Sequence, residues 1–465
     1  MVGSAYEADI DEALVRFGVP GAGWAVIADG RIAQTGVSGV QTAGERQPVT
    51  GTTRFQACSI SKPVVALAML RLVDQGVLDL DADINGILRS WRLPRNSDWQ
   101  PVVTLRQLVS HSAGLTVAGF PGYRRTEQLP TTAQILRGEF PANTAGIRVD
   151  TVPGAQFRYS GGGTIAMQLL LEEVTGAPFP ALMRELVLDP IGMADSDFTQ
   201  PPPPALYDVL ASGHRATGAV VSGGWHVYPE QAAAGLWTTP SDLCKFALAV
   251  RAAYMGAPEG LIPQPLAREM LTPQIISLTP DPLGDLNAVG LGPFLATNGP
   301  ARFGHSGGNE GFRCHLLAYR DIGVGAAVMT NSDHGTYAMQ RVFAAIAKAH
   351  DWPDLPIEIE TPDLPTESTL ASFEGRYRLH TGFEFTVTPT HHDLQVTFDR
   401  QPEMTFSSPK ANSEGPPLFV SVTSETALRL DGDTLVFLQN GQEVACERLP
   451  ANGDREPSIR PDTIR

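Results

Sequence analysis

The sequence has few charged residues, and basic residues are the rarer kind among them. Charged residues make up 18% of the 465-residue chain and hydrophobic residues 42%, a balance that excludes an intrinsically disordered protein. Lys and Arg number 34 against 50 Asp and Glu, which gives a formal net charge of −16 at pH 7. Because so acidic a chain is repelled by phosphate groups, we expect neither a nucleic acid nor a membrane surface as a partner.

Cysteine is scarce as well, and no apolar run is long. The absence of a CxxC spacing argues against a structural zinc site and predicts free thiols at Cys58, Cys244, Cys314 and Cys446. The most apolar run, residues 63–73, is interrupted by Arg71 and is shorter than the roughly 20 residues that cross a bilayer. The first residues show no basic segment followed by an apolar one, so we expect a cytoplasmic protein.

Glycine and proline, by contrast, are abundant. The 46 Gly and 38 Pro residues predict many turns between short elements. Alternating residues predict a hairpin over 24–33 and three strands within 301–330. Apolar spacing predicts helices over residues 5–18, 59–76, 164–175, 180–187, 240–255 and 333–350. The helices lie between an early and a late set of strands, which indicates an α+β fold. In such a fold the early and late strands, although far apart in the chain, form one antiparallel sheet that is flanked by the helices.

The composition changes after residue 350. Residues 351–368 contain four prolines and six acidic residues but no basic one, which is typical of an extended linker. Beyond them, short segments alternate between polar and apolar residues and are separated by turn residues, which predicts a small antiparallel barrel. We therefore expect a first domain at 1–350, a linker at 351–368, a β domain at 369–450 and a polar tail at 451–465.

The strongest chemical signal is an S-x-x-K spacing at the start of a predicted helix. Ser59 and Lys62 lie on one face of such a helix, and the apolar residues after them would bury the lysine amine. Burial lowers the pKa of a lysine, so that it can take the proton of a neighbouring hydroxyl. By itself the spacing also fits a capping serine beside a lysine that reaches solvent.

Two further segments support a nucleophilic serine. Tyr159 stands before a glycine-rich turn and could relay a proton. The second segment, residues 303–311, is rich in glycine, which lets a substrate lie close to a strand edge, and His305 in it would supply a polar or cationic contact. The backbone N–H groups of Ser59 and Gly308 would then form an oxyanion hole.

The order of these motifs is similar to that of a known family. Ser59-x-x-Lys62, Tyr159-Ser160-Gly161 and His305-Ser306-Gly307 resemble the motifs of the penicillin-recognising serine enzymes, and most of all the class C β-lactamase-related hydrolases of the CubicO type. The resemblance covers about residues 5–350. It implies a β-lactamase/transpeptidase-like fold, here followed by a lipocalin-like barrel. It also implies that the serine is acylated, that the lysine and tyrosine shuttle protons, and that the third motif, with Ser306 and Gly307, binds the substrate.

The chain departs from the family pattern at two places. Gly161 stands where the family usually has Asn, and His305-Ser306 replaces Lys-Thr, so an amide and a permanent cation are missing. These changes argue against hydrolysis of β-lactams. The resemblance then implies a serine hydrolase or acyltransferase that acts on an ester or a peptide-like amide and needs no metal or organic cofactor. Esterase or D-amino-acid-type peptidase activity is favoured, and a thioesterase or peptide cyclase of the penicillin-binding-protein type is the alternative. Glu230 could contact a substrate ammonium.

Other interpretations start from other residues. Residues 304–308 also match G-x-S-x-G, which would make Ser306 the nucleophile of an α/β-hydrolase with Asp333 and His350, but a strand-like run follows in place of a helix. A metal hydrolase would need ligand spacings that His391 and His392 do not provide. The third interpretation is a ligand-binding protein without catalytic activity. Against it, all four polar residues of the motifs are present, namely Ser59, Lys62, Tyr159 and His305.

Overall fold

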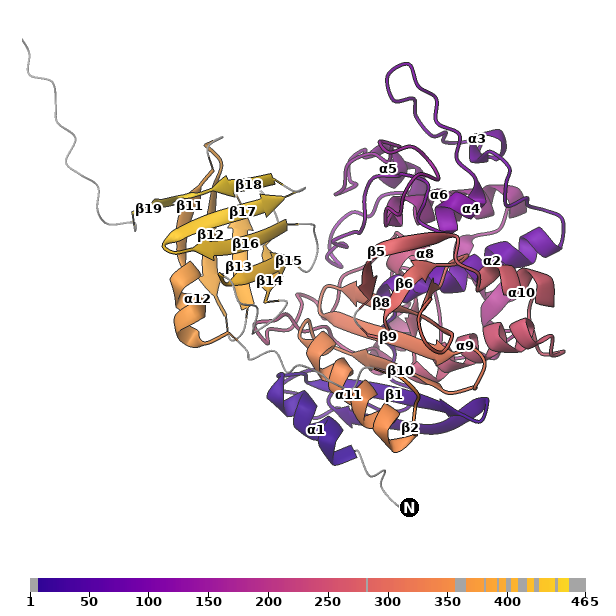
Figure 1. The fold of residues 1–465 in the computed structure, drawn as a ribbon, viewed down its shortest axis with the longest axis horizontal. Helices are drawn as coiled ribbons and strands as arrows, with labels where there is room; N and C mark the ends of the chain where they lie inside the picture. Colours follow the sequence, from indigo (N-terminus) through magenta and orange to yellow (C-terminus); the bar gives the residue numbers. More distant parts are fainter. Residues whose placement is uncertain are drawn as a thin grey trace, which may run out of the picture. The chain divides into compact units, whose positions relative to one another are not determined.

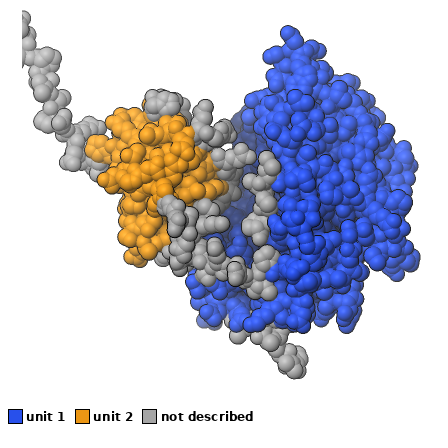
Figure 2. Space-filling model, viewed as in Figure 1, with its two compact units in different colours: residues 1–359 blue, residues 360–465 orange. Residues whose placement is uncertain are grey.

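The structure is a computed structural model of the whole chain, and it describes most of the residues. The described ranges are 7–281, 283–355, 365–379, 382–390, 393–398, 403–408, 416–421, 426–439 and 442–450. The predicted tail at 451–465, residues 356–364 of the predicted linker, and His391 and His392 lie outside them. The chain divides into two compact units, Met1–Ile359 and Glu360–Arg465, coloured separately in Figure 2.

An antiparallel sheet of eight strands forms the centre of the first unit. Its strand order is β2-β1-β10-β9-β8-β7-β6-β5, so the first hairpin of the chain pairs with the last strand of the unit. The prediction of a sheet built from distant segments is confirmed. The strands are β1 Gly21–Ala28, β2 Arg31–Gly39, β5 Ile275–Asp281, β6 Leu286–Val289, β7 Phe294–Leu295, β8 Arg302–Asn309, β9 Phe312–Tyr319 and β10 Gly325–Thr330.

Helices cover both faces of this sheet. On one face α11 (Gly335–Ala349) packs on β9 and β10 and against α1 (Glu7–Arg16), as Figure 1 shows. On the other face α9 (Pro240–Met255) packs on β1, β2 and β10. Because side chains of a strand point alternately to opposite faces, Ala327 and Met329 of β10 join the large apolar core that includes α9.

The remaining helices of the first unit surround that same core. The buried helix α2 (Ser61–Asp74) contacts α8, and α6 packs against α4, α5 and α8. The other elements are the short strands β3 Phe55–Gln56 and β4 Trp237–Thr238, which pair, and η1 Cys58–Ile60, α3 Ile84–Ile87, α4 Leu105–Val109, α5 Thr132–Arg137, α6 Gly161–Thr175, α7 Phe179–Met183, η2 Arg184–Leu188, η3 Pro204–Val209, α8 Gln231–Ala234 and α10 Gln264–Met270.

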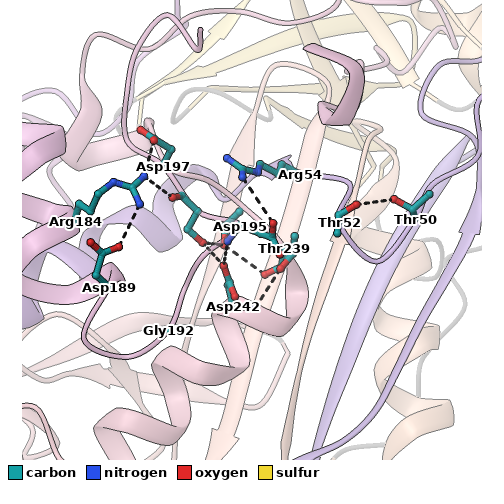
Figure 3. A network of polar contacts seen from close by, with 12 residues as sticks. Thr50, Thr52, Arg54, Arg184, Asp189, Gly192, Asp195, Asp197, Thr239 and Asp242 are labelled. Atoms are coloured by element: carbon teal, nitrogen blue, oxygen red, sulfur yellow. Dashed lines mark hydrogen bonds and ion pairs between the residues drawn. The ribbon is translucent and has the colours of Figure 1, made fainter. Parts of the chain in front are cut away.

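A buried polar network fixes the start of α9 (Figure 3). Thr239 caps the helix by accepting a hydrogen bond from the Asp242 N–H. The fully buried Asp242 carboxylate accepts from Ser196 Oγ at 2.8 Å and from Lys245 Nζ at 2.7 Å. Since β4 lies directly before this cap and pairs with β3, the network also supports the strand that leads into the S-x-x-K segment.

The second unit is a nearly closed antiparallel sheet with its own core. The strand order is β18-β17-β16-β15-β14-β13-β12-β11-β19, and α12 (Glu367–Phe373) packs on it. Aromatic and aliphatic side chains fill its centre, and the predicted barrel is confirmed. The strands are β11 Gly375–Arg378, β12 Glu384–Pro389, β13 Asp393–Phe398, β14 Met404–Ser407, β15 Leu418–Ser421, β16 Thr426–Asp431, β17 Thr434–Gln439, β18 Gln442–Ala445 and β19 Glu447–Leu449.

Three details concern other expectations from the sequence. All four cysteines are buried free thiols. Among the described residues no helix has the length and apolar character needed to span a membrane. The first part of the predicted linker packs on the first unit, because Trp352 is buried against Tyr319 and Phe343.

Candidate active site

Ser59 lies at a sharp turn between a strand and a buried helix. The chain leaves β3 and enters the single turn η1 (Cys58–Ile60), which carries Ser59 and whose first residue, Cys58, lies in the left-handed region at φ 51°. A left-handed φ is unfavourable for a residue with a side chain, so surrounding contacts must hold it. Ser61 supplies one of them, since its Oγ donates to the Cys58 carbonyl at 2.6 Å and accepts from the Leu236 N–H at 3.1 Å.

Lys62 points at the Ser59 hydroxyl. Its Nζ lies 3.0 Å from Ser59 Oγ and donates to the Ala233 carbonyl of α8 at 2.8 Å. The side chain is buried in the apolar interior around α2, and this burial lowers the pKa of Lys62 to about 7. A large share of the amine is therefore neutral at physiological pH and able to accept a proton.

Tyr159 contacts the same hydroxyl. It precedes Ser160, the N-cap of α6, whose Oγ accepts from the Gly163 N–H at 3.0 Å. The phenol hydrogen-bonds to Ser59, and burial raises the pKa of Tyr159 well above its usual value. Lys62 Nζ lies 5.0 Å from the centre of the phenol ring. The structure thus brings together the serine, lysine and tyrosine that the sequence singled out.

Strand β8 passes beside η1 with the third motif. A Cβ at Gly307 would lie 2.6 Å from the Ala57 carbonyl oxygen, so glycine is needed for this close approach. β7 pairs only with residues 303 and 304 of β8, which leaves that edge without a strand partner from His305 onward in the described part of the chain. Ser306 and Gly308 are exposed.

His305 is buried and uncharged. Its Nδ1 lies 2.5 Å from the Ser306 carbonyl oxygen, which fixes the tautomer with a proton on Nδ1. Burial, helped by nearby Lys62, lowers the pKa of His305 to about 3. Nε2 has no partner among the described residues, so it is an unpaired acceptor. The third motif therefore presents no positive charge where the family usually has lysine.

The remaining predicted residues are Gly161, the first residue of α6, and Glu230, the N-cap of α8. A side chain at Gly161 would meet Phe120 at 2.9 Å and the Ala118 carbonyl oxygen at 3.0 Å, so an aromatic ring occupies that space. Glu230, just before α8, is fully buried, and neither carboxylate oxygen has a partner among the described residues. This burial raises the pKa of Glu230 to about 8.

The sequence analysis assigned no role to His111, although it lies near Tyr159 in the structure. His111 is buried at φ 55°, its ring centroid lies 4.3 Å from that of Tyr159, and its Nδ1 accepts from the Ser160 N–H at 3.2 Å. Burial lowers its pKa well below the usual value, so the ring is neutral. A histidine at a tight turn carries no periodic signal, and only the fold brings it to Tyr159.

The α/β-hydrolase interpretation does not agree with the geometry. Ser306 lies inside β8 and is followed by β9, whereas a nucleophile elbow needs a helix after the strand. Asp333 accepts from the Gly311 N–H and pairs with Arg313 at 3.0 Å, and His350 ends α11. Asp333 is therefore engaged in holding the hairpin between β8 and β9.

Comparisons with known proteins agree with this geometry. Residues 7–351 match the family described as Beta-lactamase. Esterase EstB of Burkholderia gladioli is 29% identical over 300 residues, which are 56% of this chain and 72% of the esterase. Penicillin-binding protein 4 of Amycolatopsis lactamdurans is 26% identical over 376 residues, 78% of this chain and 94% of that protein.

A solved structure shows the same fold. The octameric penicillin-binding protein homologue from Pyrococcus abyssi superimposes with a TM-score of 0.62 at 20% identity, covering 95% of this chain and 99% of that one. The family match spans most of the first unit, and the superposition extends over nearly the whole chain. The chain therefore belongs to the beta-lactamase family and is a serine hydrolase of the β-lactamase/transpeptidase-like fold.

Proposed function

We propose that Ser59 is acylated by an ester or a peptide-like amide and that the acyl group is then passed to water or another nucleophile. The observation that carries this proposal is the 3.0 Å contact between Ser59 Oγ and the buried Lys62 amine. A serine hydroxyl is a weak nucleophile until a base removes its proton, and a lysine with a pKa of about 7 can be that base.

The proton would pass between two groups with different tasks. Lys62 takes the proton of Ser59 as Oγ attacks the carbonyl carbon, and the N–H groups of Ser59 and Gly308 stabilise the oxyanion. Tyr159, whose raised pKa keeps it protonated, then donates its proton to the leaving group and is reprotonated from Lys62. Attack by water, an alcohol or an amine on the acyl-enzyme completes hydrolysis, transesterification or peptide-bond formation.

The third motif favours a substrate that needs no carboxylate group for binding. A neutral His305 cannot form the ion pair that a lysine would form, and Gly161 offers no amide to an acyl side chain. His305, the exposed Ser306 and the adjoining Gly307 would contact the substrate along the open edge of β8. Esterase activity is therefore the first candidate, and the relationship to Esterase EstB supports it.

Glu230 favours a peptide-like substrate as the second candidate. Both of its carboxylate oxygens are buried and lack a partner among the described residues, which is costly unless a ligand compensates. A substrate ammonium would pair with the carboxylate and lower its pKa from about 8. This arrangement would suit a D-amino-acid-type peptidase, or a cyclase or thioesterase that recognises a peptide amine.

The domain assignment is part of the same proposal. We assign catalysis to residues 1–350, which include Ser59, Lys62, Tyr159 and His305, and treat 351–368 as the connection to a β domain at 369–450. The boundary between the two compact units, after Ile359, lies within this connection.

Mass spectrometry tests the nucleophile before the substrate is known. The protein would be incubated with an activated ester, a penicillin and a fluorophosphonate, with Ser59→Ala and Ser306→Ala in parallel. We expect an adduct on Ser59 that is absent in Ser59→Ala and still forms in Ser306→Ala. An adduct on Ser306, or no adduct with any probe, would contradict the proposal. Faster reaction with the ester than with the penicillin would support esterase over β-lactam chemistry.

A further inference from the structure

A buried amide joins β8 to β3 and to α8, two segments next to Ser59 and Lys62. Asn309 ends β8, directly after Gly308, and is 6% exposed. Its Nδ2 donates to Gln56 Oε1 at 2.7 Å and to the Ala234 carbonyl at 3.1 Å. Gln56 lies in β3, three residues before Ser59, and Ala234 follows Ala233, whose carbonyl binds Lys62.

The direction of these hydrogen bonds is set by the neighbours. Gln56 Nε2 donates to the His226 carbonyl at 2.8 Å, so its Oε1 must face Asn309. The Ala234 carbonyl can only accept. The Nδ2 of Asn309 therefore donates to two acceptors on different elements. An amide NH2 can donate both hydrogen bonds, whereas a carboxylate can donate neither.

The backbone of Asn309 is held by hydrogen bonds as well. Asn309 pairs with Phe312 at the end of the hairpin between β8 and β9, and its carbonyl accepts from Arg313 Nη1 at 2.7 Å. Movement of this end of β8 would shift the neighbouring Gly308 N–H relative to Ser59. β7 reaches only residues 303 and 304, so in the described residues the side chain of Asn309 is the polar link from this edge to β3 and α8.

We propose that Asn309 is a positioning residue for the reaction of Ser59: through Gln56 and Ala234 it holds the Gly308 N–H, the turn before Ser59 and the carbonyl that binds Lys62 in one arrangement. The inference rests on the proposed function, because it assumes that Ser59 is acylated. Asn309 itself is not expected to touch the reacting atoms.

Asn309→Asp and Asn309→Ala test this role. The aspartate side chain would turn an acceptor toward the Ala234 carbonyl, and the alanine side chain would remove the link without adding charge. The rate of Ser59 acylation by the activated ester would be followed by mass spectrometry from pH 5 to 9, with thermal unfolding measured beside it. We expect acylation to slow about 10-fold to 100-fold in both variants, because a misplacement of about 1 Å at the reacting groups can cost about 100-fold.

Asn331→Asp is the matched control. Asn331 is fully buried, and its Nδ2 likewise donates to two acceptors, the carbonyls of Val40 and Gln41, which are not part of the site. It should lose stability as the Asn309 variants do but keep the wild-type acylation rate and pH profile. If the Asn309 variants, folded at the assay temperature, acylate at the wild-type rate, or if Asn331→Asp slows acylation equally, the inference is wrong. Absence of Ser59 acylation in the wild-type protein would instead contradict the proposed function.

Discussion

At the scale of single residues, burial gives Lys62 and Tyr159 different roles in proton transfer. Desolvation acts in opposite directions on a lysine and a tyrosine, because it disfavours the charged form of each. The same environment therefore lowers the pKa of Lys62 to about 7 and raises that of Tyr159. His305 is uncharged as well, so among Lys62, Tyr159 and His305 it is Lys62 whose protonation changes near pH 7.

The first prediction concerns the pH dependence of acylation. Protonated Lys62 cannot accept a proton, so the rate should rise as the pH increases through about 7 and then level off. Lys62→Arg keeps the charge at every accessible pH and should lower the rate about 100-fold or more. Stopped-flow measurement of the release of an activated alcohol tests both. Lys348→Arg, at an exposed lysine in the last turn of α11, should leave the profile unchanged. A rate that is independent of pH between 6 and 8 would exclude Lys62 as the base.

The second prediction concerns the stability cost of Glu230. Its pKa is about 8 in the folded protein and ordinarily near 4.5, so the folded state holds a proton that the unfolded chain releases between these values. The free energy of unfolding should therefore fall as the pH rises from about 4.5 to 8, by up to roughly 1.4 kcal/mol per pH unit from this residue. Glu230→Gln should remove this contribution and be more stable than the wild type at pH 8.

Denaturant unfolding at several pH values measures this effect. Glu45→Gln serves as the control, since Glu45 is exposed and its loss should leave the pH dependence of stability as it is. Equal curves for Glu230→Gln and the wild-type protein would show that the carboxyl group has found a partner in solution.

At the scale of elements, the sequence predicts the regular parts of the chain well. The helix predicted over 240–255 is observed over the same residues, because Thr239 and Pro240 mark its start by their own chemistry. The helix near 180–187 changes from α to a wider turn at Arg184, which a period of 3.6 does not reveal. In the barrel, β18 and β19 have only four and three residues and no clear alternation of polar and apolar side chains, so the sequence does not indicate them.

The residues of the site also divide into those that the sequence indicates and those that it does not. Ser59, Lys62 and Tyr159 are recognisable because their types and spacing carry the chemistry, and the structure brings them together. His111, Gln56 and Asn309 act through contacts between elements that are far apart in the chain. Such contacts are set by tertiary packing, so the sequence alone assigns none of these three residues a role, although Asn309 lies within the glycine-rich segment 303–311.

The third prediction concerns the packing of β8 against η1. A Cβ at position 307 would lie 2.6 Å from the Ala57 carbonyl oxygen, 2.6 Å from Cys314 Sγ and 2.9 Å from Cys58 Cβ. Gly307→Ala should therefore push the strand away from the turn that carries Ser59, and we expect a loss of about 1–3 kcal/mol in stability together with slower acylation. Gly308→Ala is the stability control, because a Cβ there makes only ordinary contacts of 3.5 Å or more with Arg313. Calorimetry that finds Gly307→Ala as stable as Gly308→Ala would contradict this view of the packing.

At the scale of the whole molecule, the groups proposed for catalysis lie on η1, on α2, before α6 and on β8, which all belong to one unit. Residues 1–359 contain a continuous apolar core, and the second unit has a separate core of its own. The chain between them is held at its beginning, since Trp352 and Leu355 are buried and Tyr319 donates to the Pro353 carbonyl at 2.9 Å. A truncation that is meant to leave the first unit intact must therefore end after residue 355.

The fourth prediction concerns the contribution of the β domain. We expect a chain that ends at residue 359 to fold and to be acylated at Ser59 by a small activated ester at the wild-type rate. If the β domain shapes specificity, the ratio of kcat/KM for a bulky ester to that for a small one should change by about tenfold, which corresponds to about 1.4 kcal/mol. This ratio is measured on the full chain and on the truncated one, with thermal unfolding as a check on folding. An unchanged ratio would mean that substrate selection resides in the first unit, whereas loss of activity on both esters in a folded protein would mean that the β domain is needed for catalysis itself.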